Sequence, residues 1–324
     1  MDDAVLQPAP ASSATARPAV AVVGNPYSGR GANRQRVQRL LERLQASGVA
    51  ARVAWEPAAR HAMLADPDLA RWCRCVVVAG GDGTVADVLN DLPDGATVPV
   101  ATLPIGNENL FAREFGFEAP PERIAAAIAR GRTRQVDLGT CNGRVFALMA
   151  SAGFDAEVVH RVARWRVRPN GEGLRRVGRL NYGPRILAAL GRYRYPRVRV
   201  EADGHVVGEG AHAFVFNLPQ YAARLGICPE AAGDDGQLDW LVLERPGMWA
   251  LGRYGLSVIG GRHLGRPDVR HGRAERIRIT AASDGSVPAQ VDGDPAGATP
   301  MAVAVRPGAL AVVDVGADRA GDGA

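Results

Sequence analysis

The sequence predicts an α/β domain built on a parallel sheet, followed by a second domain that is rich in β-strands. Short runs of β-branched residues and alanine alternate with helical periodicities as far as residue 133. Beyond residue 134, strand patterns lie closer together and are joined by turns rich in glycine and aspartate. The 324 residues, of which 47% are hydrophobic and 23% are charged, suffice for two folded domains.

The first domain is expected over residues 18–133, after a disordered leader of residues 1–17 that is rich in alanine, proline and serine. Strands are predicted at Pro18–Gly24, Val49–Trp55, Cys75–Ala79 and Val98–Leu103, and helices at Asn33–Gln45, Pro57–Leu69, Thr84–Leu92, Glu108–Phe115 and Pro121–Ala129. Because strands and helices alternate, we expect a parallel sheet that helices cover on both faces.

The second domain is expected over residues 134–308, as a β-sandwich or a flattened barrel. Strands are predicted at Gln135–Leu138, Val145–Ser151, Val198–Ala202, Ala211–Asn217, Leu238–Leu243, Ile277–Ala281 and Ala289–Val291, with helices near Ala156–Arg164 and Leu180–Leu190. Residues 309–324 comprise a final strand, Ala309–Val315, and a frayed tail, and the strand is compatible with pairing in either domain.

The basic residues are all arginine, and the chain has a formal net charge of +5. Without lysine the sequence cannot carry the P-loop signature, so a phosphate must be held by backbone N–H groups, by arginine or through a metal ion. No apolar run approaches the roughly eighteen residues of a membrane-spanning helix, and the N-terminus lacks the pattern of a secretory signal. We therefore expect a cytoplasmic protein whose four cysteines are free, buried thiols.

The strongest chemical signal is the sequence G-G-D-G-T at Gly80–Thr84, which lies between a predicted buried strand and a predicted helix. Glycines let a phosphate approach the backbone closely, and the start of a helix supplies unpaired N–H groups. A phosphate would repel Asp82, so this carboxylate is expected to act through Mg²⁺ or as a proton acceptor. The alternative is a plain turn capped by an aspartate, which three glycines around one aspartate disfavour.

The motif at Gly80–Thr84 resembles the nucleotide loop of the superfamily of lipid kinases, NAD kinases and phosphofructokinases. Further segments resemble the diacylglycerol- and sphingosine-kinase branch in particular. Asn25–Arg30 resembles its N-P-x-[AS]-G segment, Leu103–Asn109 its P-x-G-T-x-N loop, and Val291–Asp294 its V-D-G-E segment. Val136–Gly139, Ala152–Asp155 and Asp235–Asp239 follow in the order of that family, so that the resemblance spans roughly Ala19–Val315.

The resemblance implies a parallel sheet like that of NAD kinase and phosphofructokinase, a β-rich sandwich, and an ATP- and Mg²⁺-dependent kinase that phosphorylates a lipid hydroxyl, foremost that of diacylglycerol. It places the nucleotide at Asn25, Arg30, Gly80, Gly81, Asp82, Gly83, Thr84, Gly106 and Asn109. It implies that Asp82 and Asp294 are catalytic, with Asp294 as the base that accepts the proton of the lipid hydroxyl. The carboxylates that it associates with magnesium are Asp82, Asp137, Asp235 and Asp239.

Four positions depart from the pattern of the family. Asn107 stands in place of a threonine, and Leu110 in place of an aspartate that many bacterial diacylglycerol kinases carry. Asp294 is one methylene shorter than the usual glutamate, and Arg30 replaces a frequent lysine. Three alternatives stay open: a sphingosine- or ceramide-type kinase, an NAD kinase, which shares G-G-D-G-T, and a catalytically silent regulator that binds lipid or nucleotide, with which Asn107, Leu110 and Asp294 are compatible.

An arginine-rich segment, residues 161–199, contains interleaved aromatic residues and leucine. This pattern suits peripheral contact with an anionic membrane surface and suits equally a solvated basic face. No zinc-binding or RNP-like motif supports nucleic-acid binding. The expected partners are therefore ATP and a lipid, and a homodimer is compatible with the sequence.

Overall fold

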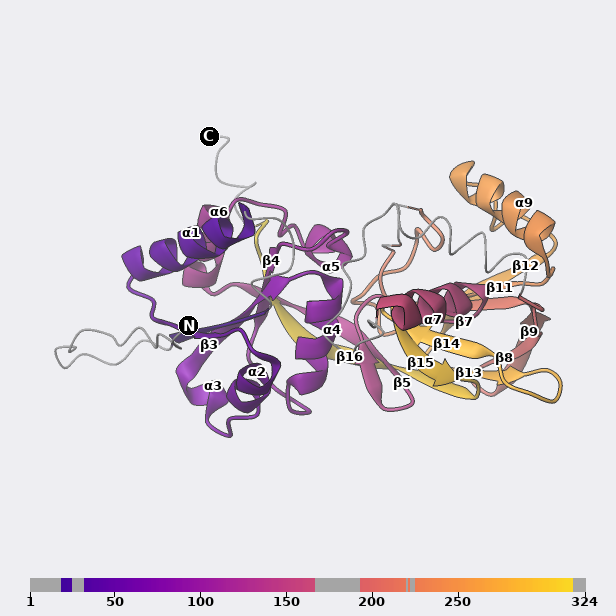
Figure 1. Ribbon diagram of the computed structural model, residues 1–324, viewed down its shortest axis with the longest axis horizontal. Helices are drawn as coiled ribbons and strands as arrows, with labels where there is room; N and C mark the ends of the chain where they lie inside the picture. The colour runs from indigo at the N-terminus through magenta and orange to yellow at the C-terminus, as the bar shows by residue number, and fades with distance from the viewer. Residues whose placement is uncertain (1–18, 25–31, 167–192, 220, 222–224, 317–324) are drawn as a thin grey trace. The chain divides into compact units, whose positions relative to one another are not determined.

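The computed structural model describes residues 19–24, 32–166, 193–219, 221 and 225–316 (Figure 1). The chain divides into two compact units, one made of residues 1–136 with 308–324 and the other of residues 137–307. The predicted fold class is confirmed, because the first unit is built on a parallel sheet and the second is a β-sandwich. The predicted helix at 180–190 and the leader lie outside the described residues.

The sheet of the first unit has the strand order β2-β1-β3-β4, with parallel pairing throughout. These strands are β1 (Ala19–Gly24), β2 (Ala51–Ala54), β3 (Cys73–Gly80) and β4 (Val100–Pro104). The last residues of β16 (Met301–Val313) add to its edge, where Val312 pairs in parallel with Val100 of β4. Most residues of β1 and β3 and all of β4 are buried, as a sheet covered on both faces requires.

Helices flank this sheet, with α1 and α6 on one face and α2 and α3 on the other (Figure 1). The helices are α1 (Ala32–Ala46), α2 (Pro57–Leu64), α3 (Leu69–Trp72), α4 (Asp82–Asp91), α5 (Leu110–Glu114) and α6 (Pro121–Arg130). The single helix predicted over 57–69 is wrong, because a turn separates α2 from α3. Pro67 disfavours helical backbone at Asp66, whose carboxylate accepts hydrogen bonds from the Asp68 N–H (2.9 Å) and from Trp72 Nε1 (2.8 Å).

The second unit contains two facing sheets. One has the order β12-β11-β10-β7-β14-β15, and the other contains β13, β8 and β9 together with parts of β16 and β5 and the short β6. The strands are β5 (Thr133–Cys141), β6 (Arg144–Phe146), β7 (Met149–Gly153), β8 (Val198–Ala202), β9 (His205–Gly210), β10 (His212–Phe216), β11 (Leu238–Leu243), β12 (Val269–Ala274), β13 (Arg276–Ala281), β14 (Pro288–Val291) and β15 (Asp294–Ala298). Their inner faces share one buried core, to which Val215 and Trp240 contribute from one sheet and Val200 and Ile279 from the other.

Two helices of the second unit are described. Helix α7 (Phe154–Arg166) lies along β7, β14 and β15, and helix α9 (Met248–Ile259) follows β11 (Figure 1). The sequence pattern indicated no helix over 248–259. All four cysteines are free and buried, as predicted. Within the described residues, no helix is both long enough and apolar enough to cross a membrane.

A buried histidine should make the stability of the second unit depend on pH. His212 is 1% exposed, lies against the rings of Phe154 and Tyr195, and has no hydrogen-bond partner for either ring nitrogen among the described residues. Burial lowers the pKa of His212 to about 4, below its ordinary value of 6.5. The neutral ring is therefore accommodated at neutral pH, and stability is lost as the pH falls from about 6.5 towards 4.

We expect His212 to account for a loss of about 2 kcal/mol in the free energy of unfolding between about pH 7 and pH 5. Urea unfolding of a His212→Leu variant should show a correspondingly flatter pH profile than the wild type. The exposed His205, replaced in the same way, serves as the control and should leave the profile unchanged. Parallel profiles for wild type and His212→Leu would show that the ring is not buried in its neutral form.

Candidate active site

The glycine-rich turn at Gly80–Thr84 joins β3 to α4 in the first unit. Gly81 precedes the helix, and its carbonyl accepts hydrogen bonds from the N–H groups of Thr84 (2.9 Å) and Val85 (3.1 Å). The turn packs tightly on its inner side, because a Cβ atom placed on Gly80 would lie 2.4 Å from Cβ of Thr84. A Cβ atom on Gly83 would meet nothing within 4 Å, so the backbone there is open to a ligand.

A second loop, residues 105–109, joins β4 to α5 and touches the first loop. The N–H of Ile105 donates to the carbonyl of Gly80 (3.1 Å). Asn109, in the left-handed region at φ 51°, closes the loop with its amide, which accepts from the Gly106 N–H (2.9 Å) and donates to the Gly106 carbonyl (3.0 Å). Gly106 lies directly against Gly81, because a Cβ atom placed on it would be 2.5 Å from Cα of Gly81.

Asp82 connects these two loops. Its Oδ1 accepts a hydrogen bond from the N–H of Phe111, in the first turn of α5, at 3.0 Å. Burial raises the pKa of Asp82, while backbone N–H groups of Phe111 and Leu110 act in the opposite direction and the carboxylate of Glu108 adds to the rise. A carboxylate that is partly removed from water and held by backbone donors is well suited to binding a cation together with an anionic ligand.

These residues fit a phosphate and a magnesium ion. The open backbone at Gly83 and the start of α4, a helix of 10 residues, offer N–H groups to an anion. Magnesium is commonly bound by one or two carboxylates together with substrate phosphates, and Asp82 provides such a carboxylate. The described part of the chain contains no cluster of three or more His, Cys, Asp or Glu residues suited to a metal.

Of the other predicted nucleotide-binding residues, Asn25 and Arg30 lie outside the described residues. Asn33, in the first turn of α1, supports the second loop and was not predicted to do so from the sequence. Its Nδ2 donates to the Ile105 carbonyl at 3.1 Å and ties the start of α1 to the second loop. Leu110, where many diacylglycerol kinases carry aspartate, is buried at the start of α5, so its side chain contributes to the core of this unit.

In the second unit, the turn between β14 and β15 carries two carboxylates with different surroundings. Asp292 accepts hydrogen bonds from three successive backbone N–H groups, those of Ala147 (2.8 Å), Leu148 (2.9 Å) and Met149 (2.9 Å). The side chain of Asp294 is 37% exposed and binds Nη2 of Arg144 at 3.0 Å. Asp292 therefore anchors the turn, whereas Asp294, the predicted base, is accessible.

A buried polar network supports the same turn. Gln290, which is 1% exposed, accepts from the N–H of Gly293 (2.9 Å) and donates to Asp155 Oδ2 (2.9 Å). Asp155 also accepts from the hydroxyl groups of Ser151 (2.7 Å) and Tyr221 (2.6 Å). Burial and the neighbouring Asp155 raise the pKa of Tyr221 far above its usual range, so the phenol remains a donor. From the sequence, no role was predicted for Asp155, and Gln290 was not predicted as part of a site.

The remaining predicted magnesium ligands lie in or beside the turn at residues 233–237, which leads into β11. Asp137 is buried in β5, and its Oδ2 accepts from the Gly236 N–H at 2.7 Å. Asp235 and Asp239 both pair with Arg273, at 3.6 and 3.4 Å. Burial raises the pKa of Asp239, and the Arg273 guanidinium opposes that rise. These two carboxylates thus already have a cation beside them, and magnesium would have to displace it.

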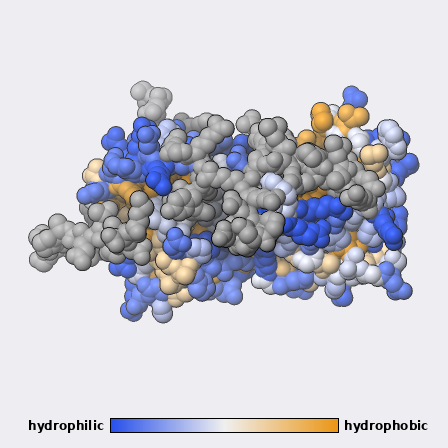
Figure 2. Space-filling model, in the orientation of Figure 1, coloured by the Kyte–Doolittle hydropathy of each residue, from blue (hydrophilic) through white to orange (hydrophobic). Residues whose placement is uncertain are grey.

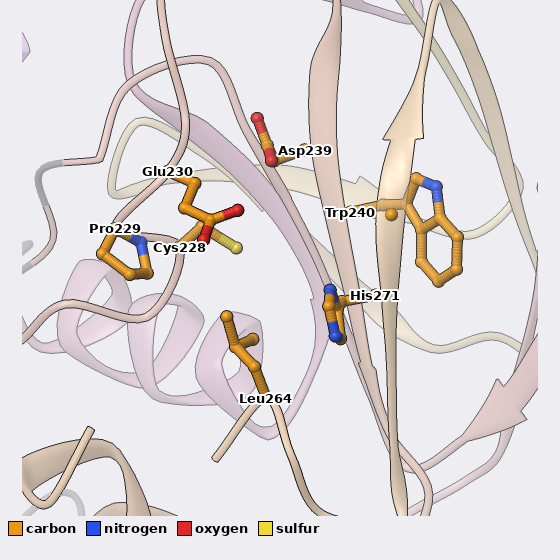
Figure 3. Close-up of a pocket in the computed structure, with 8 residues that line it drawn as sticks. Cys228, Pro229, Glu230, Asp239, Trp240, Leu264 and His271 are labelled. Atoms are coloured by element: carbon orange, nitrogen blue, oxygen red, sulfur yellow. The ribbon is translucent and has the colours of Figure 1, made fainter. Parts of the chain in front are cut away.

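Asp239 also lines a small pocket of the second unit (Figure 3). Cys228, Glu230 and Leu264 face it from one side and His271 of β12 from the other. The space is on the order of one water molecule, far below the volume of a lipid headgroup. In this structure the pocket has no room for a lipid headgroup.

The chain consists of an α/β unit with two adjoining glycine loops and a β-sandwich, and comparison with known proteins identifies its family. Residues 19–141 match the family model of the diacylglycerol kinase catalytic domain, and residues 148–314 match that of the YegS C-terminal NAD kinase beta sandwich-like domain. The chain belongs to the diacylglycerol kinase and YegS-like lipid kinase family, and it is a lipid kinase.

Individual relatives agree with this assignment. The chain is 31% identical to a diacylglycerol kinase of Mycobacterium tuberculosis over 305 residues, which cover 91% of this chain and 94% of the relative. It is also 31% identical to the "Probable lipid kinase YegS-like" of Pseudomonas aeruginosa, over 82% of this chain and 84% of the relative. Two crystal structures from Bacillus anthracis share the fold. One, a diacylglycerol kinase, matches with a TM-score of 0.64 and 18% sequence identity, and the match covers 92% of this chain and 97% of that chain. The second matches with a TM-score of 0.71 and 22% sequence identity, and the match covers 94% of this chain and 98% of that chain.

Proposed function

We propose that this protein transfers the γ-phosphoryl group of ATP to the free hydroxyl of diacylglycerol and so forms phosphatidic acid. The observation that carries the proposal is the junction of the two glycine loops at Asp82, where open backbone, the start of a helix and a carboxylate lie together. This arrangement occurs in a chain of the lipid kinase family, which supports a phosphoryl donor at the loops and a lipid as acceptor.

The residues have distinct proposed roles. The backbone of Gly81–Thr84 binds the phosphates, Gly106 and Asn109 hold the second loop against it, and Asn25 and Arg30 complete the site. Magnesium, when bound, neutralises charge on the transferring phosphoryl group. Asp82 holds that ion, and Asp294 accepts the proton of the attacking hydroxyl. In the absence of lysine, backbone donors and the planar fork of arginine provide the protein's own phosphate contacts.

The described residues do not bring Asp137, Asp235 and Asp239 together as a metal cluster, so a further magnesium ion is proposed only as a structural ion of the second unit, held by Asp235 and Asp239. Asp137 already accepts from the Gly236 backbone, and Arg273 pairs with the other two carboxylates. Such an ion would stabilise the turn at 233–237 and the start of β11 after displacing the guanidinium. No step of phosphoryl transfer depends on it.

The test is transfer of ³²P from ATP and Mg²⁺ to a panel of lipids in mixed micelles, namely diacylglycerol, monoacylglycerol, ceramide and sphingosine, with NAD as the control acceptor. Labelled phosphatidic acid is the expected product. Label in ceramide or sphingosine alone would move the substrate to the sphingoid class, and label in NAD alone would overturn the lipid assignment. ATP binding with no label in any acceptor would indicate a silent regulator.

The contact between Gly81 and Gly106 predicts that a single methyl group disrupts nucleotide binding. A Cβ atom on Gly106 would clash with the Gly81 backbone at 2.5 Å, so Gly106→Ala must push the two loops apart. We expect affinity for ATP to fall by at least about tenfold, since a shift of 1 Å in a positioning element has large effects. Gly83→Ala has open space around its new methyl group and is expected to fold with the loops in place. Calorimetric titration with ATP measures the affinity of Gly106→Ala, and an affinity equal to that of the wild type would contradict the predicted loss.

A further inference from the structure

Helix α9 of the second unit presents a large apolar face to solvent. The exposed large hydrophobic residues of the described chain are Val206, Met248, Trp249, Leu256 and Ile259, and all but Val206 belong to α9. Trp249 is 83% exposed, Leu256 73% and Ile259 74%. In the space-filling view, hydrophobic colouring gathers over this helix (Figure 2). We call Met248, Trp249, Leu256 and Ile259 the apolar face of α9.

The opposite side of α9 holds the helix to its unit. Tyr254 is 2% exposed, and its hydroxyl accepts from the Arg245 N–H (3.1 Å) and donates to the Asp268 carbonyl (3.2 Å). Leu251, three residues before Tyr254, packs against the apolar cluster around Phe154 of α7. Trp249, Leu256 and Ile259, at spacings of i, i+7 and i+10, share the other side. The attachment of the helix therefore leaves the apolar face free.

The apolar face is bordered by positive charge. Between Glu244 and Asp268 the chain contains arginine but neither aspartate nor glutamate. Asp268 pairs with Arg245 (3.0 Å) and Arg266 (2.9 Å). Arg253 and Arg262 are exposed and have no ion-pair partner among the described residues. An apolar helix face with a tryptophan and unpaired arginines at its border is typical of helices that lie in the interface of an anionic membrane.

We propose that α9 docks the protein on an anionic lipid bilayer, with Trp249, Leu256 and Ile259 entering the boundary between headgroups and acyl chains. Arg253 and Arg262 would then contact lipid phosphate groups. The proposal rests on the proposed function, since a diacylglycerol substrate resides in a bilayer. A second copy of the chain is a poorer occupant of this face, because two such faces would bring like charges together without any acidic residue from the same segment.

The first test measures co-sedimentation of the full chain with vesicles of phosphatidylcholine and phosphatidylglycerol. A triple variant, Trp249→Ser with Leu256→Ser and Ile259→Ser, should bind these vesicles at least about tenfold more weakly, since each of the three removes apolar surface from the bilayer. Val206→Ser, an exposed apolar residue of β9 at 62% exposure, is the matched control and should bind like the wild type. Equal binding of the triple variant and wild type would overturn the proposal.

The second test addresses the charges and the depth of insertion. Arg253→Gln and Arg262→Gln should each weaken binding roughly fivefold on vesicles that contain phosphatidylglycerol, and much less on pure phosphatidylcholine. The fluorescence of Trp249 should shift to shorter wavelength when vesicles are added, and Trp249→Phe should abolish the shift while retaining vesicle binding. A shift that persists in Trp249→Phe would place the inserting residue elsewhere.

The third test separates docking from catalysis. If diacylglycerol is the substrate, the triple variant should phosphorylate a short-chain, monomerically dispersed diacylglycerol at the wild-type rate and lose activity only on vesicles. If no acceptor is phosphorylated by either protein, the proposed function fails, while vesicle binding still decides the role of α9. Sedimentation velocity measures the oligomeric state of both proteins. If the wild type were a dimer and the triple variant a monomer, with equal vesicle binding, the apolar face would be a protein interface instead of a membrane-binding surface.

Discussion

Replacement of Asp82 by asparagine is expected to lower turnover at least about a thousandfold while leaving the protein folded. Asparagine keeps the oxygen that accepts the Phe111 N–H at 3.0 Å, so the two loops stay connected. It removes the negative charge that is proposed to hold magnesium. The measurement is ATP-dependent lipid phosphorylation under saturating ATP and Mg²⁺.

The same substitution lowers turnover but is expected to leave the folded protein at least as stable as the wild type. Burial raises the pKa of Asp82 above its ordinary value of 3.8, so the folded state disfavours the charged form. The stability that Asp82 contributes is therefore present at pH values below 3.8 and is lost as the pH rises through the raised pKa. At neutral pH the charge is a cost, and the melting temperature of Asp82→Asn should be no lower than that of the wild type.

A matched control lies on the same helix. Asp87 is on α4, its side chain is 53% exposed, and it pairs with Arg60 at 3.4 Å. Asp87→Asn makes the same chemical change outside the loops and should retain wild-type turnover. If Asp82→Asn also retained full turnover, the assignment of the phosphate and magnesium site to these loops would be wrong.

The local parts of the site could be predicted because their residues are adjacent in the sequence. A strand, three glycines and an aspartate at Gly80–Thr84 specify a tight turn at the start of a helix, and that is where the structure places them. The contacts that join distant segments could not be predicted in this way. The hydrogen bond from Asn33 to Ile105 links residues 72 apart, and that from Gln290 to Asp155 links residues 135 apart. A single sequence does not indicate which polar residues will be buried as partners.

The secondary structure likewise divides into elements that local sequence patterns predict and elements that depend on tertiary contacts. The strands of the first unit follow from their apolar runs, whereas α9 contains Gly252 and Gly255, which weaken a helical pattern. A surface helix is usually predicted from a polar side that faces solvent, whereas the side of α9 that faces solvent is apolar. What holds α9 is the contact of Tyr254 with Arg245 and Asp268, which depends on the tertiary structure. The features that escape sequence patterns are thus those set by packing.

The turn at residues 292–294 permits a second large prediction, in which two carboxylates separated by one glycine behave differently. Asp294→Asn should lower turnover roughly a hundredfold to ten-thousandfold, the contribution of a general base. Its ion pair with Arg144 is partly exposed, and such pairs contribute about 0–1 kcal/mol, so the free energy of unfolding should scarcely change. Asp294→Glu preserves the carboxylate and should restore most of the activity.

Asp292→Ala should have the reverse effect. It leaves the N–H groups of Ala147, Leu148 and Met149 without their acceptor, and hydrogen bonds to a charged group contribute about 1.5–3 kcal/mol each. We expect the free energy of unfolding to fall by about 3 kcal/mol or more in a urea titration, with activity declining as the fold is lost. Comparison of the two variants distinguishes chemistry from support: if Asp294→Asn destabilised the protein as much as Asp292→Ala, or left turnover intact, Asp294 would be part of the scaffold and the base would lie elsewhere.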